Sequence, residues 1–344
     1  MPESIAIDSI RLRQLYVGAI SDEGIFKNNE LIKLEQGLTE VLTSFFLKSF
    51  KMENFMTFTH ELDVEYNGAF VSAGSVFEDP QRFLEEAQNL LKLLYAFSEN
   101  GNIKEGELYI THFEDVPLED DTVSAIGIFK SEDRDPFIKV YQQEKELGLM
   151  ADEGISFNNI HKGALILDTP DLKTYKVLVF DKSSKGGQAK FWVDHFLNLK
   201  PLEDEYFQTR NFMHLCKDFA LHGQQDADRA EQVDLINRSM DFFKERDHFN
   251  QRDFEEEVLP DEEQREAFLR YRDEFMEQRQ LEDLQEDFEI SAPAMQAARR
   301  QMRSVIKLDK NFHVYVHGKR SLIEKGYDAD RGKHFYKLYF DEEN

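Results

Sequence analysis

Apolar runs typical of β-strands recur in the middle of the chain, between Asp121 and Leu199. They read VSAIGIFK, PFIKVY, GALILD, TYKVLVFD and AKFWVDHF, and they are rich in β-branched, aromatic and aliphatic residues. The segments between them carry turn-forming residues, as in SEDRDP, DTPDLK and SSKGGQ. Connections this short favour antiparallel neighbours. The pattern therefore predicts a mostly antiparallel sheet.

The alternation of apolar side chains within one of these runs predicts where that strand lies in the sheet. In Val123 to Lys130 the two alternating sets of side chains both contain apolar residues, so neither face of this strand is fully polar. A strand with two apolar faces is expected in the centre of a sheet that is covered on both sides. A further strand is expected within residues 5–20, where apolar and polar residues also alternate.

Helical spacing of apolar residues precedes the central runs. Leucine, valine and phenylalanine recur at this spacing over residues 31–46, with Asn28 or Asn29 available as the N-cap. Asp79 and Pro80 predict the start of a second helix, since aspartate caps and proline fits the first helical position. We expect these helices to cover the sheet.

Beyond Pro201 the chain becomes helical and acidic. Helices are expected over residues 203–221, 233–243 and 261–288, followed by a short one that opens at Ser291 and Pro293. Two strands then alternate, with the apolar faces Phe312, Val314, Val316 and Tyr336, Leu338, Phe340. The predicted fold class is α+β: a mostly antiparallel sheet covered by helices, then an acidic helical region ending in a C-terminal β-strand pair. The expected domains are 1–200 and 201–344.

The composition of the chain indicates the cellular compartment of the protein. The single cysteine, Cys216, excludes a disulfide framework and a cysteine-rich metal site, which fits a reducing cytoplasm. No run of 18 apolar residues occurs, and the N-terminus lacks an apolar signal core. We expect a cytoplasmic protein with no membrane partner.

Charge is distributed unevenly along the chain. The net charge is −26, and residues 226–289 hold 23 acidic against 9 basic residues. Residues 296–340 instead hold 11 basic against 4 acidic residues, a net charge of +7. The basic residues of this stretch, which is called the basic end below, are Arg299, Arg300, Arg303, Lys307, Lys310, Lys319, Arg320, Lys325, Arg331, Lys333 and Lys337.

The basic end is the strongest candidate for a DNA-binding surface. Affinity for DNA comes chiefly from lysine and arginine side chains that neutralise phosphates. Tyr315, His313 and His317 add groups that could stack or donate hydrogen bonds. Two other interpretations stay open: the arginines complement the dipole of their own helix, or the basic end pairs with the acidic helices. The acidic run itself is either a solvated face or a surface for a basic partner.

Signals for catalysis are weak. The sequence has no P-loop, nucleophile elbow or zinc-protease helix, and the pair Gly186 and Gly187 fits a hairpin turn better than a phosphate cradle. His214 and Cys216 are two residues apart on a predicted helix, so they point to different faces. Asp135 with Asp171 and Lys173 has the residue types of a metal-dependent nuclease, but the latter two fall in a predicted turn. We therefore expect no catalytic residue, metal or cofactor.

Four blocks of sequence resemble a known family. These blocks are FKSEDRDPFIKVY, GALILDTPDLKTYKVLVFDK, FWVDHFLNLKPLEDEYFQTRNFMHLCKDF and the C-terminal VIKLDKNFHVYVHGKRSLIEKGYD with KHFYKLYF. Together they resemble the bacterial nucleoid-associated proteins of the YejK/NdpA type. The resemblance implies a protein of the cytoplasmic nucleoid that contacts DNA, and it adds type II topoisomerases as candidate partners. It supplies no catalytic or base-reading residues.

Three hypotheses follow for function. The first is a non-enzymatic nucleoid-associated protein that binds DNA weakly and without sequence specificity through the basic end. The alternative is an adaptor that binds a DNA-processing enzyme such as a type II topoisomerase without touching DNA. A metal-dependent nuclease is the third. Homo-oligomer formation is compatible with each of them.

Overall fold

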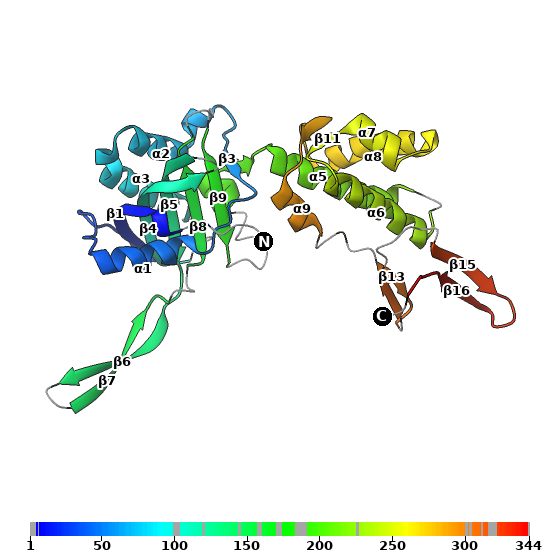
Figure 1. The fold of residues 1–344 in the computed structure, drawn as a ribbon. Helices are drawn as coiled ribbons and strands as arrows, with labels where there is room; N and C mark the ends of the chain where they lie inside the picture. The colour runs from blue at the N-terminus through cyan, green and yellow to red at the C-terminus, as the bar shows by residue number, and fades with distance from the viewer. Residues whose placement is uncertain are drawn as a thin grey trace. The chain divides into compact units, whose positions relative to one another are not determined.

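The computed structural model describes residues 5, 7–98, 104–118, 121–143, 146–156, 160–169, 174–182, 191–224, 227–299, 302, 305–310, 312–315 and 322–342. The chain divides into two compact units, with the boundary between Leu202 and Glu203. Each unit has its own hydrophobic core. The two units are called the sheet unit and the helical unit below (Figure 1).

An eight-stranded antiparallel sheet forms the sheet unit, in the order β10-β3-β9-β8-β5-β4-β1-β2. The antiparallel pairing confirms the prediction, and β5, which contains Val123 to Lys130, lies inside the sheet as expected. The strands are β1 Arg11–Ser21, β2 Gly24–Phe26, β3 Met56–Phe58, β4 Gly106–Leu118, β5 Asp121–Ser131, β8 Lys162–Leu167, β9 Lys176–Asp181 and β10 Leu199–Pro201.

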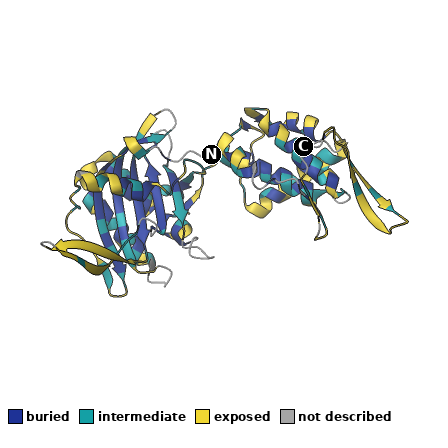
Figure 2. Ribbon diagram, turned by 60° about the horizontal axis from the view of Figure 1, so that its bottom comes forward, coloured by how far each residue is buried: buried dark blue, intermediate teal, exposed yellow. Residues whose placement is uncertain are grey.

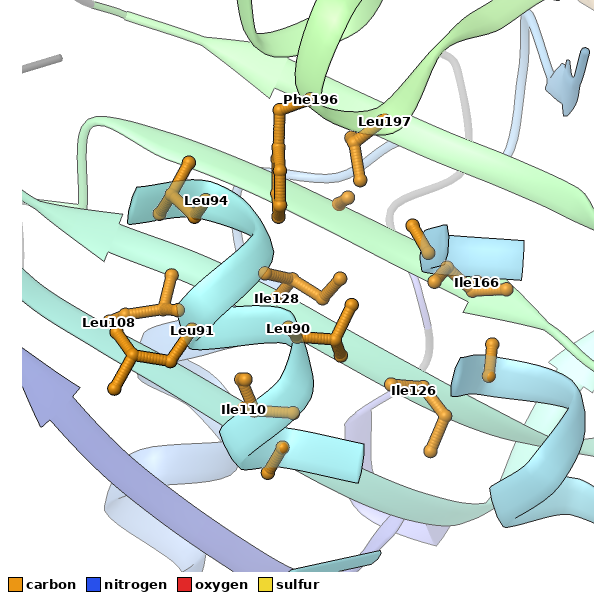
Figure 3. Packing of buried hydrophobic residues seen from close by; sticks show 14 of the residues in the cluster. Leu90, Leu91, Leu94, Leu108, Ile110, Ile126, Ile128, Ile166, Phe196 and Leu197 are labelled. Atoms are coloured by element: carbon orange, nitrogen blue, oxygen red, sulfur yellow. The ribbon is translucent and has the colours of Figure 1, made fainter. Parts of the chain in front are cut away.

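Hydrophobic clusters cover both faces of this sheet. Ile126 and Ile128 of β5 point to one side, where they pack with α2 (Gly68–Glu78) and α3 (Phe83–Ser98), as Figure 3 shows for α3. Ala125 and Phe129 point to the other side and join the cluster that contains α1 (Gln36–Leu47). The two apolar faces of this strand are therefore explained by two helical layers. Short 3-10 turns lie at η1 Ile7–Ser9, η2 Val64–Tyr66 and η3 Pro80–Arg82.

Capping residues define where the helices of the sheet unit begin. Asp79 accepts a hydrogen bond from the amide of Gln81 at 3.0 Å, and Pro80 follows it, so the predicted start of the second helix is confirmed. The first helix begins later than predicted, at Gln36, and Asn28 is not its cap. The Asn28 side chain instead donates to the carbonyl of Val17 at 2.8 Å. The apolar spacing before Gln36 belongs to an extended segment that packs on the sheet.

Two of the five central runs do not join the sheet. The run AKFWVDHF was expected to be a strand, but residues Phe191–Leu197 form a π-helical turn, η4. Its buried residues Phe191, Trp192, Phe196 and Leu197 are spaced five apart in two pairs, which places them on one side of a helix with i→i+5 hydrogen bonds.

The run PFIKVY does form a strand, β6 Asp135–Gln143, but its only partner among the described strands is β7 Glu146–Gly154. The β6–β7 hairpin projects from the sheet unit (Figure 1). Its side chains are exposed, so nothing in its apolar composition distinguished it from the buried strands.

The helical unit is built around an aromatic core. The ring centroid of Phe212 lies within 6.1 Å of those of Phe243, Phe249, Phe254 and Phe268. Its helices are α5 Glu205–Asp218, η5 Phe219–Gly223, α6 Arg229–Lys244, α7 Gln251–Val258, α8 Glu262–Arg279 and α9 Ala292–Arg299, with a short pair β11 His248–Asn250 and β12 Asp287–Glu289.

One helix of this unit is shorter than predicted. The helix expected to reach residue 288 ends at Arg279, because Gln280 adopts a left-handed conformation with φ of 54°. The chain then returns as β12 to pair with β11.

The C-terminus contains two β-hairpins. The predicted strands at Phe312 and His334 are present, but they do not pair with each other. Each pairs with a preceding strand that the sequence did not indicate, one of them inside the expected polar connection. The hairpins are β13 Val305–Leu308 with β14 Phe312–Tyr315, and β15 Ile323–Asp328 with β16 Lys333–Leu338. The α+β fold class is confirmed.

Candidate nucleic-acid interface

A small apolar cluster holds both C-terminal hairpins against α6. Ala230 and Val233, in the first turns of α6, are buried with Ile306 of β13. The start of α6 is fixed by a capping box between Asp228 and Glu231. Partly buried residues complete the cluster, one from each of the four strands: Leu308, Val314, Ile323 and Tyr336. Both hairpins of the basic end are therefore gathered at the N-terminal part of one helix.

The apolar faces predicted for these strands dock only in part. Val314 and Tyr336 pack on the cluster as expected. Phe312, Leu338 and Phe340 were expected to dock as well, but they are exposed. The cluster is small, so it covers only the residues nearest to α6 and leaves the strand ends in solvent.

Several predicted DNA-contacting residues lie on these hairpins. Five of them have exposed side chains: Lys310, Lys325, Arg331, Lys333 and Lys337. Lys310 follows β13, and Arg331 lies in the turn before β16. Lys325, Lys333 and Lys337 lie within the strands β15 and β16. Arg299 ends α9, and Lys307 lies in β13 opposite His313. The remaining four, Arg300, Arg303, Lys319 and Arg320, are outside the described residues.

The strand register divides the cations of β15–β16 between two faces. Lys325 lies opposite Tyr336, on the face that includes the residues packed against α6. Lys333 and Lys337 lie on the other face, with Glu324 and Asp328. The hairpin therefore presents a cation on each side.

Carboxylates of the hairpin offset part of its positive charge. Lys337 Nζ lies 3.1 Å from Glu324, and Arg331 lies 3.6 Å from Asp328. Hydrogen bonds from Tyr339 and from Lys337 lower the pKa of Glu324, so this carboxylate stays ionised and holds its lysine. Lys325 and Lys333 make no ion pair with any described residue. They are the cations best placed to bind phosphate.

Aromatic side chains accompany these cations. Tyr315 lies on the strand face opposite the cluster, and Tyr327, Phe335 and Tyr339 are also exposed. Exposed rings next to cations suit contacts with nucleotide bases or sugars. The arrangement combines phosphate-binding and stacking groups on one pair of hairpins.

The other candidate sites gain no support from the residues that the structure describes. Burial raises the pKa of the Cys216 thiol, so it stays protonated, and the side chain is fully buried. Asp135 starts the exposed β6, whereas Asp171 and Lys173 lie outside the described residues. No group of three or more histidine, cysteine, aspartate or glutamate side chains that could hold a metal occurs among the residues that the structure describes. None of the described helices is long and apolar enough to cross a membrane.

These features define an acidic α+β protein with a candidate nucleic-acid interface at its C-terminal hairpins. The family described as nucleoid-associated protein YejK matches residues 21–334. The chain belongs to this family of nucleoid-associated proteins. No curated protein and no solved structure matches the chain.

Sequence reasoning missed a buried ionic cluster in the sheet unit. Glu132 Oε1 lies 3.6 Å from Lys130 Nζ and 3.3 Å from Lys162 Nζ, and Lys162 also lies 3.3 Å from Asp181. These side chains are almost fully buried. A signal was present in the sequence, because Lys130 and Lys162 lie directly beside the apolar runs of β5 and β8. The cluster lies at the end of β5, where the chain leaves for β6.

Burial lowers the pKa of Lys130 in this cluster to about 8. The lysine of an unfolded chain has a pKa of about 10.4. Between about pH 8 and pH 10, therefore, the unfolded chain holds a proton here that the folded chain lacks. We expect the free energy of unfolding of the sheet unit to rise over this window. Above it, the partly buried Tyr109, whose pKa is raised by desolvation, opposes a further rise.

Chemical denaturation at several pH values measures this effect. Lys130→Met removes the titrating group, so the variant should show a smaller rise between pH 8 and 10 than the unchanged protein. Identical pH profiles for the two proteins would contradict the assignment to Lys130.

Proposed function

We propose that this protein binds duplex DNA directly, weakly and without sequence preference through the two C-terminal hairpins. The observation that carries the proposal is the gathering of exposed cations and aromatic rings on hairpins that share one docking cluster on α6. Phosphate contacts from such cations need no fixed motif. Membership of the nucleoid-associated family supports the same conclusion, and it supports a location in the cytoplasmic nucleoid.

The charge distribution explains why binding should be weak. The chain carries −26 in total, so most of its surface repels DNA. Two carboxylates of the hairpin also compete with phosphate for its cations. Contact with DNA is therefore confined to the basic end and should be sensitive to salt.

A salt titration tests this proposal. If roughly 4 to 6 cations contact phosphates, the logarithm of the DNA affinity should fall with the logarithm of the salt concentration at a slope of about −4 to −5. Fluorescence anisotropy with two duplexes of unrelated sequence measures both the slope and the lack of preference. Absence of binding at low salt would reject direct DNA contact.

An adaptor function is the second candidate, and one feature of the helical unit favours it. An open cavity of about 1210 Å³ lies among η5, α6 and α8. Acidic side chains dominate its charged lining: Glu231, Asp234, Asp261, Glu262, Glu263 and Glu274 against Arg238 and Arg270. Such a cavity suits a basic segment of a DNA-processing enzyme, for example a type II topoisomerase. Pull-down of a purified topoisomerase without detectable DNA binding would favour this candidate.

We also propose that the protein is not an enzyme. The nuclease hypothesis needs Asp135 as part of a metal site, and this residue lies at the start of an exposed hairpin. Incubation of supercoiled DNA with magnesium or manganese should leave it intact. Nicking that disappears in Asp135→Asn would support the nuclease instead.

A further inference from the structure

The β6–β7 hairpin is an exposed structure without a core of its own. Its strands pair from Asp135 with Gly154 to Gln143 with Glu146. None of its described residues belongs to the buried clusters, and Figure 2 shows both strands as exposed. An isolated two-stranded hairpin is marginally stable in water, and three or more strands with a shared apolar face are needed for stability. The hairpin therefore lacks the packing that its apolar composition would allow.

One face of this hairpin is covered by its own side chains. The ring of Tyr141 lies over Gly148, where an added Cβ would approach it to 2.5 Å. The ring of Phe137 lies in the same way over Gly154. Lys139 is on this face as well, because it alternates with these two residues along β6. This face is therefore aromatic and charged, and its rings are partly exposed: Phe137 is 45% and Tyr141 is 40% exposed.

The opposite face is an open aliphatic surface. Ile138 and Val140 of β6 are 71% and 60% exposed, and Leu147 and Leu149 of β7 are 78% and 70% exposed. Val140 lies directly opposite Leu149, so the four side chains form one continuous patch. The one charged residue on this face among the described positions is Glu153, at the base of the hairpin. Contiguous exposed apolar patches of this kind mark interaction sites.

We infer that this aliphatic face is a self-association surface, on which the same face of a second copy of the chain packs. A two-fold interface brings a surface against itself, which requires self-complementarity. An aliphatic patch with its single charge at one end meets this requirement, whereas a patch of one charge sign would repel its copy. Packing two hairpins face to face also gives four strands around one apolar layer, which supplies the missing core.

The charges of the hairpin argue against an anionic membrane or DNA as the occupant. Its described charged residues are Lys139 against Asp135, Glu146, Asp152 and Glu153, a net charge of −3. A negative hairpin is unsuited to an anionic membrane surface or to DNA. The surface is therefore distinct from the proposed DNA-binding hairpins.

Disulfide cross-linking tests this inference directly. Cys216 is the single cysteine of the chain and is buried, so a disulfide formed on oxidation can be assigned to an introduced, exposed cysteine. Leu149→Cys places a thiol near the centre of the aliphatic face, and mild oxidation should give a covalent dimer. Lys139→Cys is the matched control on the other face of the same hairpin, and oxidation of this variant should give no covalent dimer. Equal cross-linking of the two variants would overturn the inference.

Sedimentation velocity provides a second test that does not depend on cross-linking. The unchanged protein should associate as its concentration rises, and Val140→Lys with Leu149→Lys should be monomeric with an unchanged melting temperature. Leu62→Lys changes a residue that is 78% exposed outside the hairpin, and it should associate normally. A monomeric unchanged protein, or association that persists in the double variant, would refute the inference. Neither test uses DNA, so the result is independent of the proposed function.

Discussion

Reversal of two lysines on the last hairpin, Lys325→Glu with Lys333→Glu, should weaken DNA binding about tenfold or more at moderate salt. The salt slope should become shallower by about 1 to 2, because each lost phosphate contact removes about one unit of slope. These lysines lie on opposite faces of the β15–β16 hairpin, so the result does not depend on which face meets DNA. Neither makes an ion pair with a described residue, and exposed charges contribute less than about 1 kcal/mol to stability. The melting temperature should therefore stay unchanged.

A control variant with the same change in net charge distinguishes the loss of a local phosphate contact from an effect of overall charge. Lys27→Glu with Lys200→Glu changes the total charge by the same amount, and both lysines are exposed in the sheet unit. DNA affinity and melting temperature are measured on the same samples of all three proteins. If the control loses as much affinity as the hairpin variant, the effect is one of overall charge, and the interface has been placed wrongly. A marked loss of melting temperature in the hairpin variant would instead assign these lysines to the fold.

Removal of the Glu132 side chain should destabilise the sheet unit by about 3–5 kcal/mol, the usual cost of leaving a buried charge without its partner. In Glu132→Ala, the ammonium groups of Lys130 and Lys162 remain buried. Asp181 is then the one carboxylate left of the two that pair with these lysines. The backbone carbonyl of Lys104, which accepts a hydrogen bond from Lys130 at 2.5 Å, cannot balance this charge. Urea unfolding followed by circular dichroism measures the loss.

An exposed ion pair in the same unit serves as the control. Arg13 donates to Glu114 at 2.6 Å, and both side chains are substantially exposed. Arg13→Ala should cost less than about 1 kcal/mol. A cost for Glu132→Ala as small as that of the control would mean that water reaches the cluster and that its charges are not buried in solution.

The association of copies through β6–β7 would have a functional consequence for the proposed DNA-binding hairpins. A dimer carries two basic ends, and two weak sites on one particle bind DNA more tightly than either site alone when the spacing allows both to engage. Comparison of DNA affinity for the unchanged protein and for Val140→Lys with Leu149→Lys would measure this contribution.

The sequence by itself determined the features that depend on neighbouring residues. Asp79 and Pro80 define a helix start because their cap and ring geometry act within one turn. The two apolar faces of Val123 to Lys130 define an inner strand because side chains alternate along any strand. The antiparallel pairing, the α+β class and the membership of the family were all indicated before the structure. So was the concentration of cations at the C-terminus, which depends on composition alone.

Only the tertiary structure decided which runs pair with which. The runs PFIKVY and VSAIGIFK have similar composition, yet β5 is buried between two helical layers while β6 is exposed in a projecting hairpin. Among the described strands β6 pairs with the neighbouring β7 alone, whereas β5 pairs with both β4 and β8, and the residues of either run do not by themselves set this difference. The cluster around Glu132 depends on the register of β8 with β5 and β9, and the division of Lys325 and Lys333 between two faces depends on the register of β15 with β16. The sequence could therefore place the cations at one end of the chain, but their geometry came from the pairing of strands.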